Sequence, residues 1–252
     1  LVDSKGNKFQ LRGISTHGIN WDVGSPYVNK KAFKTLRDDW GVNAIRLAMY
    51  TEEYNGYCSG GSQAKLRKLV DKGVGYATDL GMYAIIDWHI LSDGNPNKNK
   101  SQAKKFFTTM AKKYKNNKNV IYEICNEPNG CGWKEIKSYA TDIIKTIRKY
   151  DKKAVIIVGT PTWSQLGTDG TSNEVADSPI KGYKNIMYSL HFYASEWAHN
   201  EYLPAKVAYA RKKKLPIIVS EFGLSPASGD GAINKASADK WMKLLNKYNI
   251  SY

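Results

Sequence analysis

Two glutamates stand at the ends of apolar runs, where a carboxylate could take part in chemistry. In "VIYEICNEPNG" (residues 120–130), Glu127 follows a strand-like run and precedes Pro128. Proline cannot donate to a sheet ladder and holds the preceding residue extended, so the strand must end near Glu127. In "PIIVSEFG" (216–223), Glu221 follows another apolar run. Two carboxylates delivered to one rim favour acid–base or nucleophilic chemistry over two frayed surface ends.

Further polar side chains end the neighbouring apolar runs. They are Arg46 in "NAIRLAMY", His89 in "IIDWHIL", Asn126, and both His191 and Tyr193 in "YSLHFYA". A charge inside a barrel is costly when unpaired, so Arg46 needs a carboxylate partner, and the strand-end glutamates are available. Glu123 shares side-chain parity with Glu127, and we expect it to form a structural ion pair. Asp87 is also expected to be structural.

The elements that position these residues are strands alternating with helices. Apolar runs predict strands within residues 9–15, 42–50, 82–90, 119–125, 154–159, 185–193 and 216–223. Apolar residues recur at helical spacing in residues 63–81, 101–114, 133–150, 202–214 and 234–248. Gly81 is expected to end the first of these helices.

A (β/α)₈ TIM barrel fits this alternation better than an open doubly wound sheet. An open sheet usually places a Gly-rich turn after its first strand, and "RGISTHGINW" lacks that pattern. Seven strands and the beginning of an eighth in "NISY" fit a barrel, whose typical length is about 250 residues. We expect one catalytic domain over residues 1–252, with a short N-terminal β-hairpin, turning at 4–7, that plugs the barrel floor.

The end of the chain predicts an incomplete barrel. Ile250 to Tyr252 can supply only three residues of the eighth strand, and no closing helix follows them. We therefore expect the eighth strand and closing helix to be missing, which would leave unpaired edges between the seventh and first strands.

Composition excludes several classes of protein. The net charge is +15, but the lysines form short clusters such as "KKYKNNKN" at helical spacing, which favours solvated helix faces over nucleic-acid binding. Cys58, Cys125 and Cys131 show no CxxC spacing, so neither a disulfide framework nor a zinc site is predicted. No apolar run is long enough to span a membrane, and the first residues lack a signal-peptide pattern. We expect a soluble chain whose export signal has been removed.

The ordered motifs resemble glycoside hydrolase family 5 along the whole chain. The resemblance rests on "IRL", "DWH", "NEP", "HFY" and "SEFG" at successive strand ends. The segments "STHGINW", "IIDWHILSDGNP" and "VGTPTWSQ" are similar to its bacterial endo-β-1,4-glucanase (cellulase) branch. This resemblance implies a secreted, endo-acting enzyme that cleaves internal β-1,4-glucosidic bonds of cellulose or related β-glucans with retention. It implies neither a cofactor nor a metal.

The resemblance also assigns roles to residues. Glu127 would be the general acid/base and Glu221 the nucleophile, with Arg46 and Tyr193 keeping Glu221 ionised. Asn126 would hold the sugar 2-hydroxyl, while His89 and His191 would orient hydroxyls and carboxylates. Four residues are expected to bind substrate: His17 and Trp21 on the nonreducing side, Trp163 on the leaving-group side, and Trp197 after the sixth strand. Other tryptophans, among them Trp40, are expected only to pack.

Three rival interpretations remain open to test. A metal-dependent hydrolase would want an HxH pair, and His17, His89, His191 and His199 are isolated. A catalytically silent sugar-binding barrel would keep the aromatic residues but has no reason to keep both carboxylates with Arg46. A nucleic-acid-binding role rests on net charge alone. The sequence does not show whether cellulose, mixed-linkage glucan, xyloglucan or mannan is the preferred substrate. It does not show the oligomeric state either, although we expect a monomer.

Overall fold

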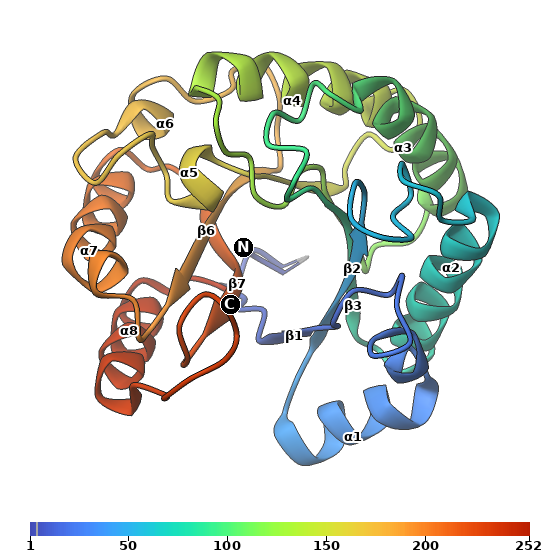
Figure 1. The fold of residues 1–252 in the computed structure, drawn as a ribbon, viewed down its shortest axis with the longest axis horizontal. Coiled ribbons are helices and arrows are strands. Elements are labelled where there is room, and N and C mark those ends of the chain that lie inside the picture. Colours follow the sequence, from blue (N-terminus) through green and yellow to red (C-terminus); the bar gives the residue numbers. More distant parts are fainter. Residues whose placement is uncertain (4) are drawn as a thin grey trace.

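The strands form one parallel sheet that curves into a nearly closed barrel (Figure 1). The computed structural model describes residues 1–3 and 5–252. The sheet order is β1-β2-β3-β4-β5-β6-β7, the order of the strands in the chain. The strands are β1 (Gly13–Ser15), β2 (Ala44–Tyr50), β3 (Tyr83–His89), β4 (Val120–Glu123), β5 (Val155–Val158), β6 (Ile186–Tyr193) and β7 (Ile217–Gly223). Each lies within a predicted run, so the barrel prediction is confirmed.

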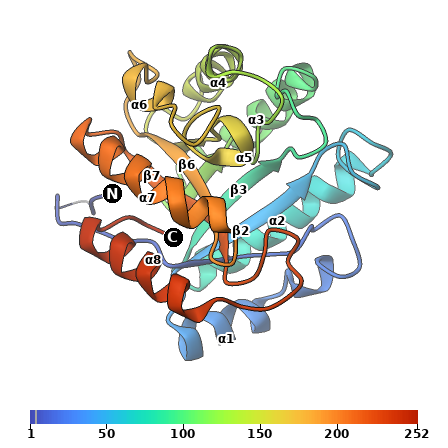
Figure 2. The same ribbon diagram turned by 60° about the vertical axis from the view of Figure 1, so that its left-hand side comes forward.

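Helices surround the barrel and follow the strands in alternation (Figures 1 and 2). They are η1 (Ser25–Tyr27), α1 (Lys30–Trp40), α2 (Gln63–Asp79), α3 (Lys100–Tyr114), α4 (Trp133–Arg148), α5 (Pro161–Ser164), α6 (Glu174–Asp177), α7 (Trp197–Lys212) and α8 (Lys235–Tyr248). The sequence patterns did not predict α1. The Asn29 side chain caps this helix by accepting a hydrogen bond from Ala32 N. Gly81 follows α2 with a φ of +69°, as expected of a residue that ends a helix.

Apolar residues fill both the barrel base and the layer between sheet and helices. The base is closed by one residue from each strand or its approach: Leu11, Ala44, Ile85, Ile121, Ile157, Met187 and Ile218. Phe9 packs below them, and Val2 pairs with Lys8 in an antiparallel bridge. The predicted hairpin is therefore present, although Ser4 in its turn lies outside the described residues. This packed base leaves the carboxyl ends of the strands for polar residues.

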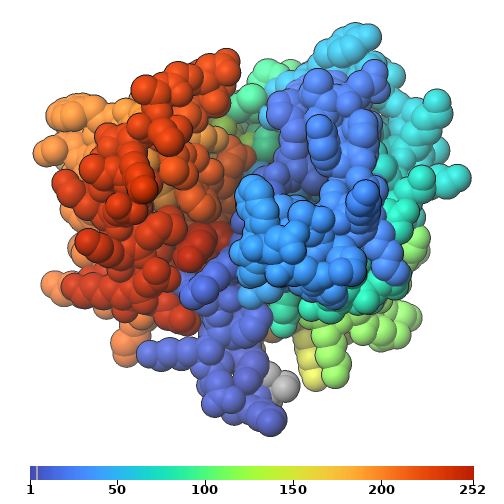
Figure 3. Space-filling view, turned by 90° about the horizontal axis from the view of Figure 1, so that it is seen from below, coloured from blue at the N-terminus to red at the C-terminus, as the bar shows by residue number. Residues whose placement is uncertain are grey.

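The last residues of the chain lie between β7 and β1, where Figure 1 marks the C-terminus. Val219 N donates to Ser251 O at 2.9 Å, and Tyr252 N donates to Leu11 O at 3.0 Å. Gly13 N in turn donates to Tyr252 O at 2.8 Å. The expectation of fully unpaired edges was wrong at the barrel base, because these residues hydrogen-bond to both sides. Seen from below, the first (blue) and last (red) parts of the chain lie against each other (Figure 3).

The described helices include none that is long and apolar enough to cross a membrane.

Candidate active site

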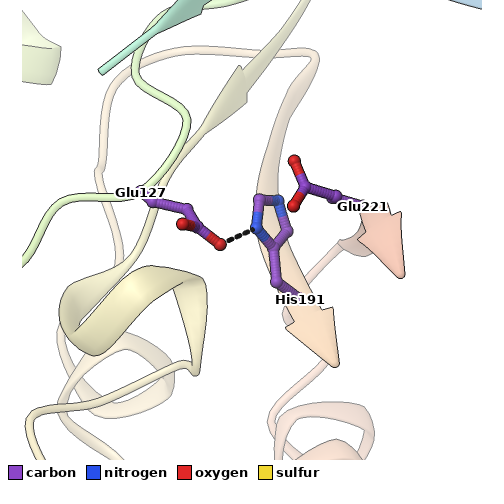
Figure 4. A group of neighbouring side chains, drawn as sticks. All are labelled: Glu127, His191 and Glu221. Carbon is purple, nitrogen blue, oxygen red and sulfur yellow. Dashed lines mark hydrogen bonds and ion pairs between the residues drawn. The ribbon is translucent and has the colours of Figure 1, made fainter. Parts of the chain in front are cut away.

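The two strand-end glutamates meet across the barrel rim, with His191 between them (Figure 4). Glu127 follows β4, His191 lies on β6 and Glu221 lies on β7. One carboxylate oxygen of each glutamate and one ring nitrogen of His191 lie within 4.8 Å of one another. Retaining glycosidases hold their two carboxyl groups about 5 to 5.5 Å apart, whereas inverting enzymes separate them by about 6.5 to 9.5 Å. The spacing of Glu127 and Glu221 fits the retaining geometry, in which one carboxylate attacks the sugar directly.

Glu221 is held as an anion by two neighbours. Arg46 Nη1 lies 3.1 Å from its Oε2, and the Tyr193 hydroxyl donates to its Oε1. Burial alone would raise the pKa of Glu221, but the positive charges of His191 and Arg46 and the Tyr193 hydrogen bond lower it to about 2. Burial and the Glu221 charge raise the pKa of Tyr193 in return, so Tyr193 stays a donor. Glu221 is thus unprotonated and available as a nucleophile at neutral pH.

Arg46 lies in the barrel interior and is only 2% exposed. Its Nε donates to Glu123 Oε2 at 2.7 Å, and its Nη2 lies 3.1 Å from Asp87 Oδ2. Together with Glu221, these contacts confirm that Arg46 is paired with strand-end carboxylates. They also confirm Glu123 and Asp87 as members of a buried ion-pair network, in which breaking one partner would leave an uncompensated charge.

Arg46 also sets the orientation of Asn126 and the tautomer of His89. Because a guanidinium can only donate, Arg46 Nη2 at 2.6 Å identifies Asn126 Oδ1 as an acceptor. The Asn126 amide nitrogen then donates to Ile90 O and to His89 Nε2, each at 3.1 Å. Neutral His89 consequently carries its proton on Nδ1, which donates to Asp87 Oδ2 at 2.5 Å. The Asn126 side chain is fully buried.

Glu127 has a different environment from Glu221. Its Oε1 lies 2.8 Å from His191 Nδ1, and no guanidinium or ammonium among the described residues pairs with it. Burial lowers the pKa of His191, but the hydrogen bond to Glu127 and the charges of Glu221 and Glu127 outweigh that effect and raise it. Glu127 and His191 can therefore share one proton, whereas Glu221 keeps none. This difference suits the roles expected of the two residues, an acid at Glu127 and a nucleophile at Glu221.

Trp163 is presented by a strained backbone segment after β5. Thr162, Trp163 and Ser164 have φ values of +57°, +52° and +61°, the left-handed region that costs about 1 to 3 kcal/mol per non-glycine residue. Trp163 N donates to Pro128 O at 3.0 Å, and Ser164 Oγ donates to Asn126 O at 2.7 Å. These bonds tie the segment to the chain on either side of Glu127. Trp163 remains 47% exposed, so its ring is available as a platform.

An aromatic run leads to the catalytic centre from the β1 side. His17 and Trp21 have ring centroids 5.5 Å apart, Trp21 and Tyr50 lie at 4.5 Å, and Tyr50 and His89 lie at 4.0 Å. Trp21 is held in place by its Nε1, which donates to Tyr54 O at 2.6 Å. The structure therefore connects His17 and Trp21 to His89 through Tyr50, a residue that the sequence patterns had not singled out.

A hollow of about 400 Å³ opens on the other side of the carboxylate pair. Its walls carry several polar residues that the sequence reading did not select, namely Gln165, Glu196 and His199, beside Glu127 and Trp163. Trp197 is the first residue of α7 rather than a loop residue. It is 69% exposed, and its ring packs edge-on against Tyr202. It is not among the described residues that line the hollow.

The packing expectation for Trp40 was wrong, because Trp40 is 69% exposed.

Two carboxylates and an imidazole at this spacing could also coordinate a divalent cation. Both Glu221 oxygens already accept protein hydrogen bonds, and one of them comes from the guanidinium of Arg46. A second cation beside Arg46 would meet a like charge, so this donor set fits a metal poorly.

The model of the family described as cellulase, glycosyl hydrolase family 5, matches residues 2–252. The chain belongs to this family. Among curated family members, endoglucanase A of Butyrivibrio fibrisolvens is 48% identical over 255 residues, covering 100% of this chain and 57% of that protein. An endoglucanase of Clostridium saccharobutylicum is 49% identical over 256 residues, covering 100% of this chain and 54% of that protein. The family 5 chain thus spans about half the length of these relatives.

Solved family 5 structures share the barrel. A variant catalytic domain of Thermobifida fusca endoglucanase Cel5A, in complex with cellotetraose, superposes with a TM-score of 0.88 at 39% identity. The match covers 99% of this chain and 79% of that chain. Cellulase Cel5C_n gives a TM-score of 0.93 at 39% identity, covering 100% of this chain and 76% of that chain.

This family 5 chain gathers all seven predicted catalytic residues around one rim: Arg46, His89, Asn126, Glu127, His191, Tyr193 and Glu221. Ser220, which contacts both His191 and Glu123, was missed. Its place directly before Glu221 in "SEFG" was the available signal.

Proposed function

We propose that the protein is an endo-β-1,4-glucanase that hydrolyses internal bonds of cellulose or related β-glucans and retains the anomeric configuration. The observation that carries the proposal is the carboxylate pair, whose oxygens lie within 4.8 Å of each other. The different partners of Glu127 and Glu221 support distinct roles, because only Glu221 contacts a guanidinium. The bound cellotetraose of the Thermobifida fusca relative supports a β-1,4-glucan as the substrate.

In the first step, Glu221 acts as the nucleophile. One carboxylate oxygen attacks the anomeric carbon and forms an ester bond, while the glycosidic carbon–oxygen bond breaks. The electron pair of that bond goes to the departing oxygen, which takes the proton of Glu127. Arg46 and Tyr193 hold Glu221 in position for this attack. The second lone pair of Asn126 Oδ1 is left for the predicted 2-hydroxyl contact, since both amide hydrogens have protein acceptors.

In the second step, Glu127 acts as a base. It takes a proton from water as the water oxygen attacks the anomeric carbon, and the ester bond returns its electron pair to Glu221. Two inversions at the same carbon give a product of retained configuration. His191 Nδ1 lies 2.8 Å from Glu127 Oε1, so its ring takes part in holding the proton that Glu127 delivers.

Aromatic residues on both sides of the carboxylate pair support endo action. We propose that His17 and Trp21 bind sugar on the nonreducing side, that Trp163 stacks a sugar on the leaving-group side, and that Trp197 contacts the chain farther out. A β-glucan polymer is too large to enter a cell, which favours secretion. We expect a monomer that binds neither nucleic acid nor membranes.

Proton NMR of the first product tests the proposal. On a soluble β-1,4-glucan or cello-oligosaccharide, the β-anomer should form first and the α-anomer only later by mutarotation. Viscosity should fall faster than reducing ends accumulate, as random internal cleavage requires. Full activity in excess EDTA would oppose a metal-dependent mechanism. Binding of cellotetraose without any turnover would instead identify a sugar-binding barrel, and first formation of the α-anomer would contradict retention.

A further inference from the structure

Ser220 occupies an irregular position in β7 that turns it toward the catalytic residues. Leu190 pairs with Val219, whereas His191 pairs with Glu221, so Ser220 is an extra residue without a partner on β6. Such a bulge re-aims side chains and breaks the strict alternation of a strand. As a result, Ser220 and Glu221 both reach catalytic-site partners although they are adjacent in sequence.

The Ser220 hydroxyl has every hydrogen-bonding position occupied. Its Oγ lies 2.6 Å from Glu123 Oε1, 2.9 Å from His191 Nε2 and 2.5 Å from Ser189 Oγ. Glu123 accepts on its other oxygen from Arg46 Nε at 2.7 Å. A hydroxyl has one hydrogen and two lone pairs. Its hydrogen is best directed to the Glu123 carboxylate, because charge-assisted bonds are about twice as strong as neutral ones.

This arrangement determines which ring nitrogen of neutral His191 carries the proton. With its hydrogen given to Glu123, Ser220 can only accept from the His191 ring. We propose that Ser220 is a positioning residue that holds the proton of neutral His191 on Nε2, so that the lone pair of Nδ1 faces Glu127. The tautomer follows from the contacts alone, while its catalytic consequence rests on the proposed function. His89 is set in the opposite tautomer by Asn126.

The consequence concerns the proton that Glu127 must deliver. When Glu127 and His191 together hold one proton, it lies between Glu127 Oε1 and Nδ1, which are 2.8 Å apart. If that proton is lost, the Nδ1 lone pair faces an anionic oxygen at the same distance, which is repulsive. The opposite tautomer would instead donate from Nδ1 to the anion and stabilise it. By excluding that tautomer, Ser220 keeps the shared proton in place to higher pH.

Several charged groups face His191, and all must be counted in its titration. Glu127 approaches from the chain after β4, Glu221 from β7 and Arg46 from β2. Glu123 is connected through Ser220, and His199 on α7 lies within electrostatic range. Their combined effect raises the pKa of His191 despite burial. Ser220 adds no charge to this group, so its effect must come through proton placement.

Nitrogen-15 NMR of protein labelled at histidine tests the tautomer without any substrate. The spectrum is recorded at a pH above the alkaline limb of activity, and the His191 signals are assigned by their absence in His191→Asn. We expect the wild type and Ser220→Thr to carry the proton on Nε2, and Ser220→Ala to gain the Nδ1-protonated form. Protonation of Nδ1 in the wild type would overturn the proposal, whether or not the protein hydrolyses β-glucan.

The pH profile of kcat/KM on a substrate with a poor leaving group tests the consequence. The alkaline limb should shift down by about one pH unit in Ser220→Ala, because a hydrogen bond newly stabilises the deprotonated pair. Ser220→Thr, which keeps the hydroxyl, should restore the limb. Ser189→Ala is the matched control, since it removes a hydroxyl 2.5 Å from the same oxygen but leaves Glu123 as the acceptor.

Two outcomes would overturn the positioning role. One is an unmoved alkaline limb in a folded Ser220→Ala protein, and the other is an equal shift in Ser189→Ala. If Ser220→Ala does not fold, the wild-type and Ser220→Thr spectra still decide the tautomer. Absence of turnover in the wild type would contradict the proposed function instead, and the spectra would remain decisive for the tautomer.

Discussion

Arg46 Nη1 lies 3.1 Å from Glu221 Oε2, although 175 residues separate the two in the chain. The same guanidinium donates to Glu123 and Asn126 through its other nitrogens. Arg46 therefore couples Glu221, the proposed nucleophile on β7, to the strand that delivers Glu127. Because the guanidinium is buried and fully engaged, its replacement would disturb every partner at once. Sharper tests change one partner at a time.

Glu221→Ala should lower kcat for unactivated β-glucan by about 10⁴-fold or more, because the proposed mechanism forms its ester on this carboxylate. Azide added with an activated aryl β-cellobioside should restore part of the turnover, since it fits the space of the missing carboxylate. The product, identified by NMR, should be the α-glycosyl azide, the result of one inversion. A β-glycosyl azide, or wild-type activity in the variant, would contradict the assignment.

Glu127→Gln should slow the hydrolysis of a substrate more strongly when its leaving group needs a proton to depart. General acid catalysis contributes about 10² to 10⁴ in rate, so the loss should be of this size for cello-oligosaccharides. Formation of the ester from an activated aryl glycoside should be much less affected, because its leaving group needs little protonation. Pre-steady-state release of the phenol measures that step. Equal losses on both substrates would point to another acid.

Tyr193→Phe should move the acid limb of kcat/KM to higher pH. Tyr193 donates to Glu221, whose pKa is lowered to about 2 from its ordinary 4.5. Hydrogen bonds to charged groups contribute about 1.5 to 3 kcal/mol, and 1.36 kcal/mol corresponds to one pH unit, so a shift of about one to two units is expected. An unmoved acid limb would show that Tyr193 does not stabilise the anion.

The same shift has a consequence for stability. A carboxyl group whose pKa is lowered on folding stabilises the fold above its ordinary pKa, and this contribution disappears as pH falls through the lowered value. For Glu221 the loss lies between pH 4.5 and about 2. The free energy of unfolding of Tyr193→Phe should therefore depend less on pH in this window than that of the wild type. A steeper dependence in the variant would contradict the stated cause.

Trp163→Ala should raise KM for cello-oligosaccharides that extend to the leaving-group side. Stacking on aromatic faces contributes about 0.5 to 1.5 kcal/mol beyond burial, so kcat/KM should fall roughly tenfold, with little effect on short aryl glycosides. Trp40→Ala is the matched control, because Trp40 is also an exposed tryptophan but lies on α1. Trp197→Ala should have a smaller effect. An equal loss for Trp40 and Trp163 would remove the platform role.

Sequence patterns predicted the strands and their polar ends well because each strand is a continuous apolar run ending on a charged or polar residue. Ser220 escaped prediction because the bulge at that position breaks the two-residue alternation of side chains along the strand. That alternation is the basis for predicting which face of the sheet a side chain points to. The start of α7 was placed too late, since its first turn, from Trp197, carries few apolar residues. The left-handed backbone at Trp163 also escaped, because hydrogen bonds to distant residues stabilise it.

Trapping of the covalent intermediate tests the central claim most directly. Incubation with 2-deoxy-2-fluoro-β-cellobiosyl fluoride should slow hydrolysis of the ester enough for it to accumulate. Mass spectrometry should then find one sugar label per protein on the peptide that contains Glu221, and Glu221→Ala should remain unlabelled. A label on another residue, or turnover of natural β-glucan by Glu221→Ala at the wild-type rate, would contradict the account.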